Sequence, residues 1–541
     1  MGKLRIRLLA LLLVVALLLS GCDASRLESL WYQLGNLLGM SFVTTFDEMK
    51  YTRPDMDALE ESLAACLTAV EEEAAADKLM EAVWDFYTGY NAFYTGYYLA
   101  DIRYCKDVTD IYWTEEYEWC MEQSAKADAA LEELYYALAA CAQREALEEQ
   151  GYFVPGFLDA YEGENIWSDE LIALLEEESR LVSEYYAVNG EAASVPYYSE
   201  EYFTTYGAEM LDIFTQLVAL RQQIAQCAGY EDYPTYAYEQ NFYRDYTPQQ
   251  VQTYFDQVQQ ELVPIYRETD VSAIVSGVSG LCKEEDTFFY VKSCAKAMGG
   301  AFEEAFSLME AGQLYDISYG ENKYEVSFEV FLPDYMEPYI FVCPGMNQTD
   351  KLTFAHEFGH FTNDYASGGT MVDVDVAEIF SQSMENLSLL YADGGEKLTR
   401  YRMFSVLATH VEQAAYASFE YSAYMLPEEQ VTSENILALY EKTGKAFGFD
   451  SWNWDPRDLV AITHFYMVPM YISSYVLSND AALQIYQREL AQTGAGVELL
   501  QEQLTTEESY LLAFLEQAGL ESPFTEGRVK SIAQTIRDAL R

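Results

Sequence analysis

The stretch "LTFAHEFGHFTNDYA" (residues 352–366) places the strongest constraint on how this 541-residue chain can fold. It contains two of only four histidines, His356 and His360, with Glu357 directly after the first. On a helix, residues i and i+4 lie on one face with Cβ atoms about 6 Å apart, so both imidazoles could reach one metal ion. Gly359 costs such a helix up to about 1 kcal/mol relative to Ala, but it permits close approach of another segment.

Zinc is the metal that this pattern favours. Neutral imidazoles combined with a carboxylate suit zinc in a tetrahedral site with one open position. Such a site lowers the pKa of a water towards about 7, and Glu357 could take its proton as a general base while the water attacks a carbonyl. The alternative is two helix histidines satisfied by their neighbours, and Gly359 counts against a purely structural helix. The sequence therefore predicts one Zn²⁺ per chain.

A third protein ligand must come from elsewhere, and the downstream stretch "DVDVAEIFSQSMENL" offers candidates. Four polar residues there share one helix face at i, i+3, i+4 and i+7: Glu378, Ser381, Gln382 and Glu385. One carboxylate on this second helix would complete the coordination, and another one or two turns on could orient a histidine. Asp373 and Asp375, in the approach to the helix, compete for the ligand role.

The pattern along the chain is mostly helical. Apolar residues recur at intervals of three and four before about residue 185, and "YAVNGEAASVPYYSE" (186–200) then breaks this pattern. Alternation in "YEVSFEVF" and the short run "PYIFVC" predict two strands just before the histidines. A helix should begin near Thr349 or Asp350. We therefore expect a mostly α protein with a small sheet beside the histidine helix, an N-terminal helical region over 23–190 and a catalytic domain over 200–541.

The first 22 residues have the form of an export signal. "MGKLRIR" is positively charged, Leu8 to Leu19 is apolar, and "LSGC" resembles the bacterial lipobox. This predicts a signal peptide over 1–21, lipidation of Cys22, and a protein anchored by lipid to the outer side of a bacterial cell membrane. The alternatives are an ordinary signal peptide cut later or a short uncleaved anchor. The other eight cysteines show no compact disulfide framework.

The charge balance excludes one class of partner. The chain has 31 basic and 89 acidic residues, a formal net charge of −58. Such a surface repels nucleic acid and anionic lipid, so we expect no nucleic-acid binding and no membrane contact beyond the N-terminal lipid. It could draw in basic peptides, although a solvated acidic surface is the simpler interpretation.

"FAHEFGH" followed by "VAEIFSQSMEN" resembles the thimet oligopeptidase and oligoendopeptidase F family of zinc metallopeptidases. The resemblance covers roughly residues 200–500, and the N-terminal helices are only generically similar. It implies that Glu378 is the third zinc ligand and that Glu385 supports a ligand from outside the coordination sphere. It also implies a helical, bowl-like body with a deep channel, and an endopeptidase that cleaves short peptides.

"THFYMVPMYISSYVLS" resembles the family's substrate segment. The resemblance implies that His464, with Tyr471 or Tyr475, holds the developing oxyanion. Helical spacing would place the two tyrosines on one face, with Tyr471 facing His464 at i+7. His410 has no motif around it and is interpreted as a structural or surface residue.

Two departures from the family bear on substrate preference: Asn363 stands where the family often has a histidine, and the loop "SGGTMVDVD" is short. We also expect 339–343 to form an edge strand that pairs with substrate. Three alternatives stay open: a dipeptide-releasing zinc carboxypeptidase, a peptide-binding lipoprotein with a vestigial zinc site, and a scaffold with structural zinc. The intact Glu357 argues against a pure binder.

Overall fold

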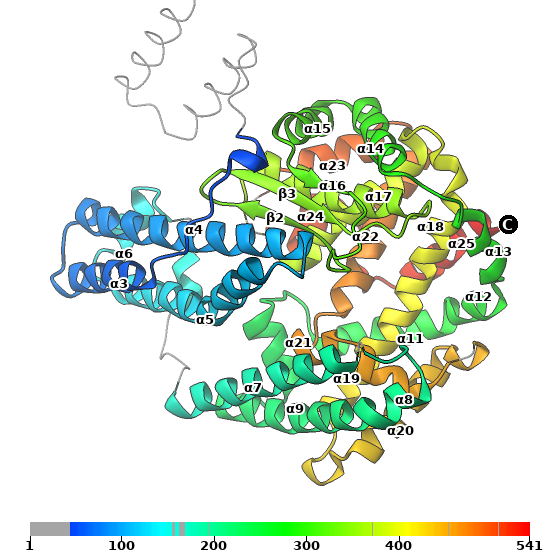
Figure 1. The fold of residues 1–541 in the computed structure, drawn as a ribbon, viewed down its shortest axis with the longest axis horizontal. Helices are drawn as coiled ribbons and strands as arrows, with labels where there is room; N and C mark the ends of the chain where they lie inside the picture. The colour runs from blue at the N-terminus through cyan, green and yellow to red at the C-terminus, as the bar shows by residue number, and fades with distance from the viewer. Residues whose placement is uncertain are drawn as a thin grey trace, which may run out of the picture.

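The computed structural model describes residues 44–153, 157–161, 168–192, 194–370, 372–452, 454–506 and 508–541. The signal peptide and Cys22 lie outside these ranges. Helices dominate, and a small sheet lies beside the histidine helix, as the sequence predicts (Figure 1). Within the described ranges, every helix is too short or too polar to span a bilayer.

A group of N-terminal helices lies to one side of the main body (Figure 1). Asp55 and Asp110 cap two of them by accepting backbone hydrogen bonds. The elements of this group and the helix that follows are η1 (Phe46–Glu48), α3 (Met56–Glu71), α4 (Ala76–Lys106), α5 (Ile111–Ala140), α6 (Arg144–Glu149), η2 (Phe157–Tyr161) and α7 (Asp169–Ala192).

Two hydrophobic cores divide the chain. The smaller core contains residues between Leu59 and Leu158, including the fully buried Cys66. The larger core contains Phe46 and Met49, the C-terminal part of α4 and residues from Leu171 onward, including Tyr185 of α7. The break between α7 and α8 falls inside the predicted interval 186–200, while the domain division itself stays a prediction.

Backbone hydrogen bonds join the N-terminal group to the loops of the sheet. The Tyr324 amide donates to the Cys105 carbonyl at the end of α4 (2.9 Å), and the Asp334 amide donates to Thr95 Oγ1 (2.9 Å). These bonds lie at both ends of the strand that precedes the hairpin turn. They fix the N-terminal helices beside the part of the sheet nearest the histidines.

The sheet has three strands in the order β1-β3-β2, namely β1 (Tyr315–Asp316), β2 (Ser327–Leu332) and β3 (Glu337–Val342). β3 pairs antiparallel with β2, with Ser327 opposite Val342, and parallel with β1. The expectation that 339–343 form an edge strand is wrong, because β1 occupies the other side of β3. β1 and β2 are the edge strands of this sheet instead.

The helices between α7 and the sheet wind around the lower, right and upper parts of the body (Figure 1). Thr247 caps α11 through a reciprocal bond with Gln250, and Pro248 is the first residue of the helix. These elements are α8 (Glu200–Tyr202), η3 (Phe203–Gly207), α9 (Ala208–Cys227), α10 (Tyr233–Tyr236), η4 (Ala237–Asn241), α11 (Pro248–Glu261), α12 (Val263–Glu268), α13 (Val271–Val278), α14 (Glu284–Met298) and α15 (Gly300–Gly312).

The histidine helix α16 (Asp350–Ser367) begins at the predicted residue and packs on α17 (Val374–Tyr391). α17 in turn packs on α22 (Ser473–Ala491) and is buried along most of its length. The remaining elements are η5 (Gly395–Lys397), α18 (Thr399–Ala408), η6 (Thr409–Gln413), α19 (Ala414–Tyr424), η7 (Glu428–Gln430), α20 (Ser433–Ala446), η8 (Phe449–Ser451), η9 (Pro456–Ala461), α21 (His464–Met467), α23 (Ala495–Gln503), α24 (Leu511–Gln517) and α25 (Arg528–Leu540).

Gly359 is the point of closest approach between α16 and α17. A Cβ atom at this position would lie 2.5 Å from Ser381 Cα and 2.6 Å from the Phe380 carbonyl oxygen. Both contacts are with backbone, which cannot rotate away. The close approach that Gly359 permits is therefore realised, and it occurs between the two helices that carry the candidate ligands.

We predict that Gly359→Ala destabilises the protein by about 1–3 kcal/mol or more, because the added methyl forces α16 and α17 apart. Gly190→Ala is the matched control. Gly190 is also helical, and an added Cβ there meets nothing within 4 Å. Its replacement should leave stability unchanged or raise it by up to about 1 kcal/mol. Denaturant titrations compare the two variants, and equal stability of both would contradict the prediction.

Candidate metal centre

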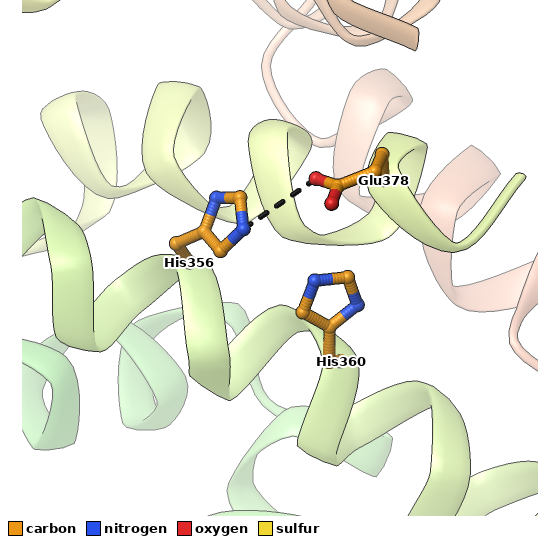
Figure 2. Close-up of side chains that lie close together, drawn as sticks. All are labelled: His356, His360 and Glu378. Carbon is orange, nitrogen blue, oxygen red and sulfur yellow. Dashed lines mark ion pairs between the residues drawn. The ribbon is translucent and has the colours of Figure 1, made fainter. Parts of the chain in front are cut away.

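The structure brings His356, His360 and Glu378 together between α16 and α17 (Figure 2). One ligand atom from each lies within 4.8 Å of the others, and His356 Nε2 is 3.5 Å from Glu378 Oε2. Tetrahedral ligands at about 2.0–2.1 Å from one zinc ion lie about 3.4 Å apart, so the His356–Glu378 spacing already suits zinc. In the described part of the chain this is the one group with metal-binding geometry. The role of the three residues as ligands stays a prediction.

Glu385 supports His356 from the far side of the imidazole. His356 Nδ1 donates to Glu385 Oε1 at 2.9 Å, which leaves Nε2 facing Glu378. Arg402 Nη1 lies 3.3 Å from Glu385 Oε2. Burial opposes ionisation of Glu385, but Arg402 and His356 outweigh it and lower its pKa. An ionised carboxylate on the outer ring nitrogen fixes the orientation of a metal-binding histidine.

The charges around the two imidazoles favour a cation between them. Burial opposes protonation of His356, yet the hydrogen bond with Glu385 and the charge of Glu378 raise its pKa to about 9. Burial, assisted by His356, lowers the pKa of His360 to about 3 and keeps it neutral. Zinc binds neutral imidazole in surroundings that favour positive charge, and His360 and its neighbours provide both.

Glu357 lies on α16 next to these residues, and its side chain is buried. Burial raises its pKa to about 7, although the charge of His356 acts in the opposite direction. A carboxylate with a pKa near neutrality is suited to accept and return a proton.

Asp373 and Asp375, the competing candidates, do not join the imidazoles. The Asp375 carboxylate accepts a hydrogen bond from Tyr246 (2.5 Å) and lies 3.7 Å from Arg244 Nε. Of the residues on the shared α17 face, Glu378 reaches the metal group, and Ser381 Oγ donates to its Oε2 at 3.0 Å.

His464, Tyr471 and Tyr475 form a second cluster. Their ring centroids are 5.2–5.9 Å apart, and His464 Nε2 lies 3.4 Å from the Tyr475 hydroxyl. Burial and the charge of Glu378 raise the pKa of Tyr475 to about 12, and Glu378 acts on Tyr471 in the same direction. The cluster therefore borders the metal group.

The prediction that Tyr471 shares a helix face with His464 and Tyr475 is wrong. α21 ends at Met467 and α22 begins at Ser473, so Tyr471 lies in the turn between them. Pro469 disfavours helix at the residue before it, and Met470 has a left-handed φ of 67°. The rings meet because the chain folds back at this turn.

The two remaining predictions concern buried polar residues. His410 is structural and fully buried rather than on the surface, and its Nδ1 donates to the Val406 carbonyl (2.8 Å). Asn363 is also buried and donates to the Leu504 carbonyl (3.1 Å). Asn363 therefore fixes α16 to the segment after α23.

Sequence reasoning missed three buried polar side chains that hold residues 464–475 in place, namely Arg221, Glu420 and Arg244. Arg221 of α9 donates to the Phe465 carbonyl (2.7 Å) and to the Tyr466 carbonyl. Glu420 of α19 accepts from the Met470 amide (3.0 Å). A single Arg or Glu in a long helical pattern gives no signal of such a contact, because its partners are distant backbone groups.

Arg244 is the third of these side chains and the one that also reaches α17. Its Nη1 donates to the Met470 carbonyl (3.0 Å), and its Nη2 donates to Ser474 Oγ (2.8 Å). Its Nε faces Asp375, three residues before Glu378. One guanidinium thus links the tyrosine turn to the helix of the candidate third ligand.

Comparisons with known proteins matched one domain of the sequence and the overall fold. Residues 46–154 match the peptidase M3 N-terminal domain. The structure is similar to PZ peptidase A (TM-score 0.79, 20% identity, 92% of this chain and 99% of that chain). It is also similar to a putative oligoendopeptidase F from Bacillus anthracis (0.75, 21%, 92% and 98%).

The chain has the oligoendopeptidase fold. The family resemblance inferred from the sequence is thus confirmed. The domain match and the fold together support the conclusion that the protein is a peptidase. The matching domain lies in the helices that appeared only generically similar. A carboxypeptidase from Pyrococcus furiosus has a related structure (TM-score 0.51, 12% identity, 91% and 100%). No curated protein sequence matches.

We predict that Arg244→Lys lowers kcat/KM for peptide cleavage by about 10- to 100-fold, because lysine keeps the charge but loses the fork that holds the Tyr471 turn. Zinc content should not change. The control is Arg267→Lys, since Arg267 is partly exposed and pairs with Asp450 outside the site. Steady-state kinetics, zinc analysis and melting curves provide the comparison. A folded, zinc-loaded Arg244→Lys enzyme with normal kcat/KM would exclude this positioning role.

Proposed function

We propose that this protein is a zinc-dependent endopeptidase that hydrolyses short peptides. The observation that carries the proposal is the convergence of His356, His360 and Glu378 beside the buried carboxylate of Glu357. The peptidase M3 match and the oligoendopeptidase fold support it. His356, His360 and Glu378 would hold one zinc ion, and Glu385 would orient His356 through Nδ1.

In the proposed reaction, zinc supplies Lewis-acid chemistry that polarises the scissile carbonyl and makes water a stronger nucleophile. Glu357 accepts the proton of the attacking water and then delivers it to the leaving amine. His464 and a hydroxyl of Tyr471 or Tyr475 donate hydrogen bonds to the oxyanion that develops on the carbonyl oxygen. The raised pKa of Tyr475 keeps its hydroxyl protonated for this purpose.

Glu357→Gln tests the proposal. The soluble chain from Asp23 onward is loaded with zinc and given an internally quenched peptide of about ten residues, blocked at both ends. We expect wild-type cleavage at an internal bond, and a loss of about 10²–10⁴-fold in kcat for Glu357→Gln at equal zinc content. Glu428→Gln, an exposed acid in η7, serves as the control and should cleave normally. A chelator should abolish cleavage, and added zinc should restore it.

Two other outcomes would replace the proposal. Cleavage only of a peptide with a free C-terminus, releasing dipeptides, would make the protein a carboxypeptidase, a reading favoured by the related Pyrococcus furiosus structure. Binding of peptide without cleavage by wild type or variant would indicate a peptide-binding protein with a vestigial site.

We also propose that the protein is anchored outside the cytoplasm by lipid on Cys22. The support is the sequence of residues 1–22, which resembles a lipoprotein signal. The full-length chain expressed in a bacterium should fractionate with membranes and carry a lipid-modified N-terminal Cys22. Cys22→Ser should lose the modification. A mature N-terminus at any other residue of the wild type would contradict this localisation.

A further inference from the structure

An aromatic cavity of about 740 Å³ lies on elements that carry none of the metal-centre residues. Its walls come from Tyr198, from Phe203 of η3, from α12, η6 and α19, and from residues of the segments 449–452 and 454–458. The helices α12 and α19 lie below α16 and α17 in Figure 1. Of its eleven lining residues, seven are aromatic, three are acidic, one is proline and none is basic. A volume of this size is typical of small-molecule sites.

The aromatic rings form a box rather than a flat patch. Tyr266 and Trp452 have ring centroids 5.3 Å apart at 44°. Phe449 packs edge-on against both Trp454 (5.4 Å, 76°) and Tyr416 (5.7 Å, 72°). Aromatic rings that line one space attract organic cations through the negative faces of their π-systems.

Two carboxylates line the same space without a cationic partner. Glu412 accepts from the Tyr266 hydroxyl (2.6 Å), and Asp458 accepts from Trp454 Nε1 (3.1 Å). Among the described residues, neither forms an ion pair. The nearby Arg457 is already bound to Asp455 (2.6 Å) and Glu200 (2.9 Å), and its guanidinium lies 4.5 Å from the centre of the Phe203 ring. In the part of the chain that the structure describes, neither Glu412 nor Asp458 therefore has an arginine partner of its own, and both carboxylates line the cavity.

Glu412 and Asp458 differ from ordinary surface acids because both are partly buried. Burial raises the pKa of Asp458 to about 6 and raises that of Glu412 as well. Glu412 lies in η6, a π-helical turn, and such turns occur frequently at functional sites. A bound cation would relieve the cost of partly burying two unpaired carboxylates.

We propose that this cavity binds a small organic cation with an alkylammonium or guanidinium head, held between the aromatic rings and the carboxylates of Glu412 and Asp458. A metal ion is a poorer fit, because most of the wall is aromatic and the two acids each have an oxygen engaged by a ring donor. The cation could be a free polyamine or the basic side chain of a peptide, and both sources share this head-group chemistry.

Calorimetric titration of the zinc-loaded protein tests the proposal with three named probes. N-acetyl-L-arginine amide carries the guanidinium, N-acetyl-L-citrulline amide is its uncharged analogue, and spermidine represents a free polyamine. We expect the arginine compound or spermidine to bind at least about tenfold tighter than the citrulline compound. Tighter arginine binding would assign the site to a peptide side chain, and tighter spermidine binding to a free polyamine.

Substitutions locate the binding within the cavity. Glu412→Gln with Asp458→Asn keeps both hydrogen-bond acceptors and should weaken cation binding at least about tenfold. Trp452→Leu keeps both charges and should also weaken it. Glu428→Gln, outside the cavity, should not. Melting curves and peptide cleavage confirm that each variant is folded and active. Equal binding of arginine and citrulline compounds, no binding at about 10 mM, or binding unchanged in the variants would overturn the proposal.

Discussion

The backbone contact between α16 and α17 at Gly359 sets the geometry of the candidate metal centre. His356 lies just before this contact and His360 directly after it, while Glu378 lies one turn before Ser381 on the facing helix. The distances between the ligand atoms therefore depend on how closely the two backbones approach. A larger residue at position 359 would move both imidazoles together away from the carboxylate.

Around this contact, the structure adds supports from elements far apart in the sequence. Arg402 of α18 holds Glu385, and Glu385 holds His356. Arg244 joins α17 to the tyrosine turn, and Arg221 holds the residues after His464. The chain has only 31 basic residues, yet several arginines are placed in the interior, where each satisfies carbonyl or carboxylate oxygens that would otherwise be unpaired.

Local patterns were sufficient to predict much of this site. The spacing of His356 and His360, the alternation before them and the i, i+7 pair on α17 all follow from helix and strand periods, which neighbouring residues determine. The order of the strands and the turn at Met470 could not be predicted in this way, because pairing of β3 with β1 and contacts to Arg221, Arg244 and Glu420 join residues distant in sequence. Spacing alone left Glu378 as one of several acids. The family resemblance distinguished it, and the packing of α16 on α17 places it beside the imidazoles.

The separate N-terminal core has a consequence for how the chain matures. Whether the polypeptide emerges from a ribosome or from an export pore, it emerges N-terminus first, so the core between Leu59 and Leu158 can close before the histidine helix appears. The C-terminal part of α4 then still lacks its packing partners, because Leu99 and Ile102 belong to the larger core. Until the rest of the larger core has folded, these apolar residues of α4 are exposed. They are the part of the nascent chain that a chaperone would need to shield.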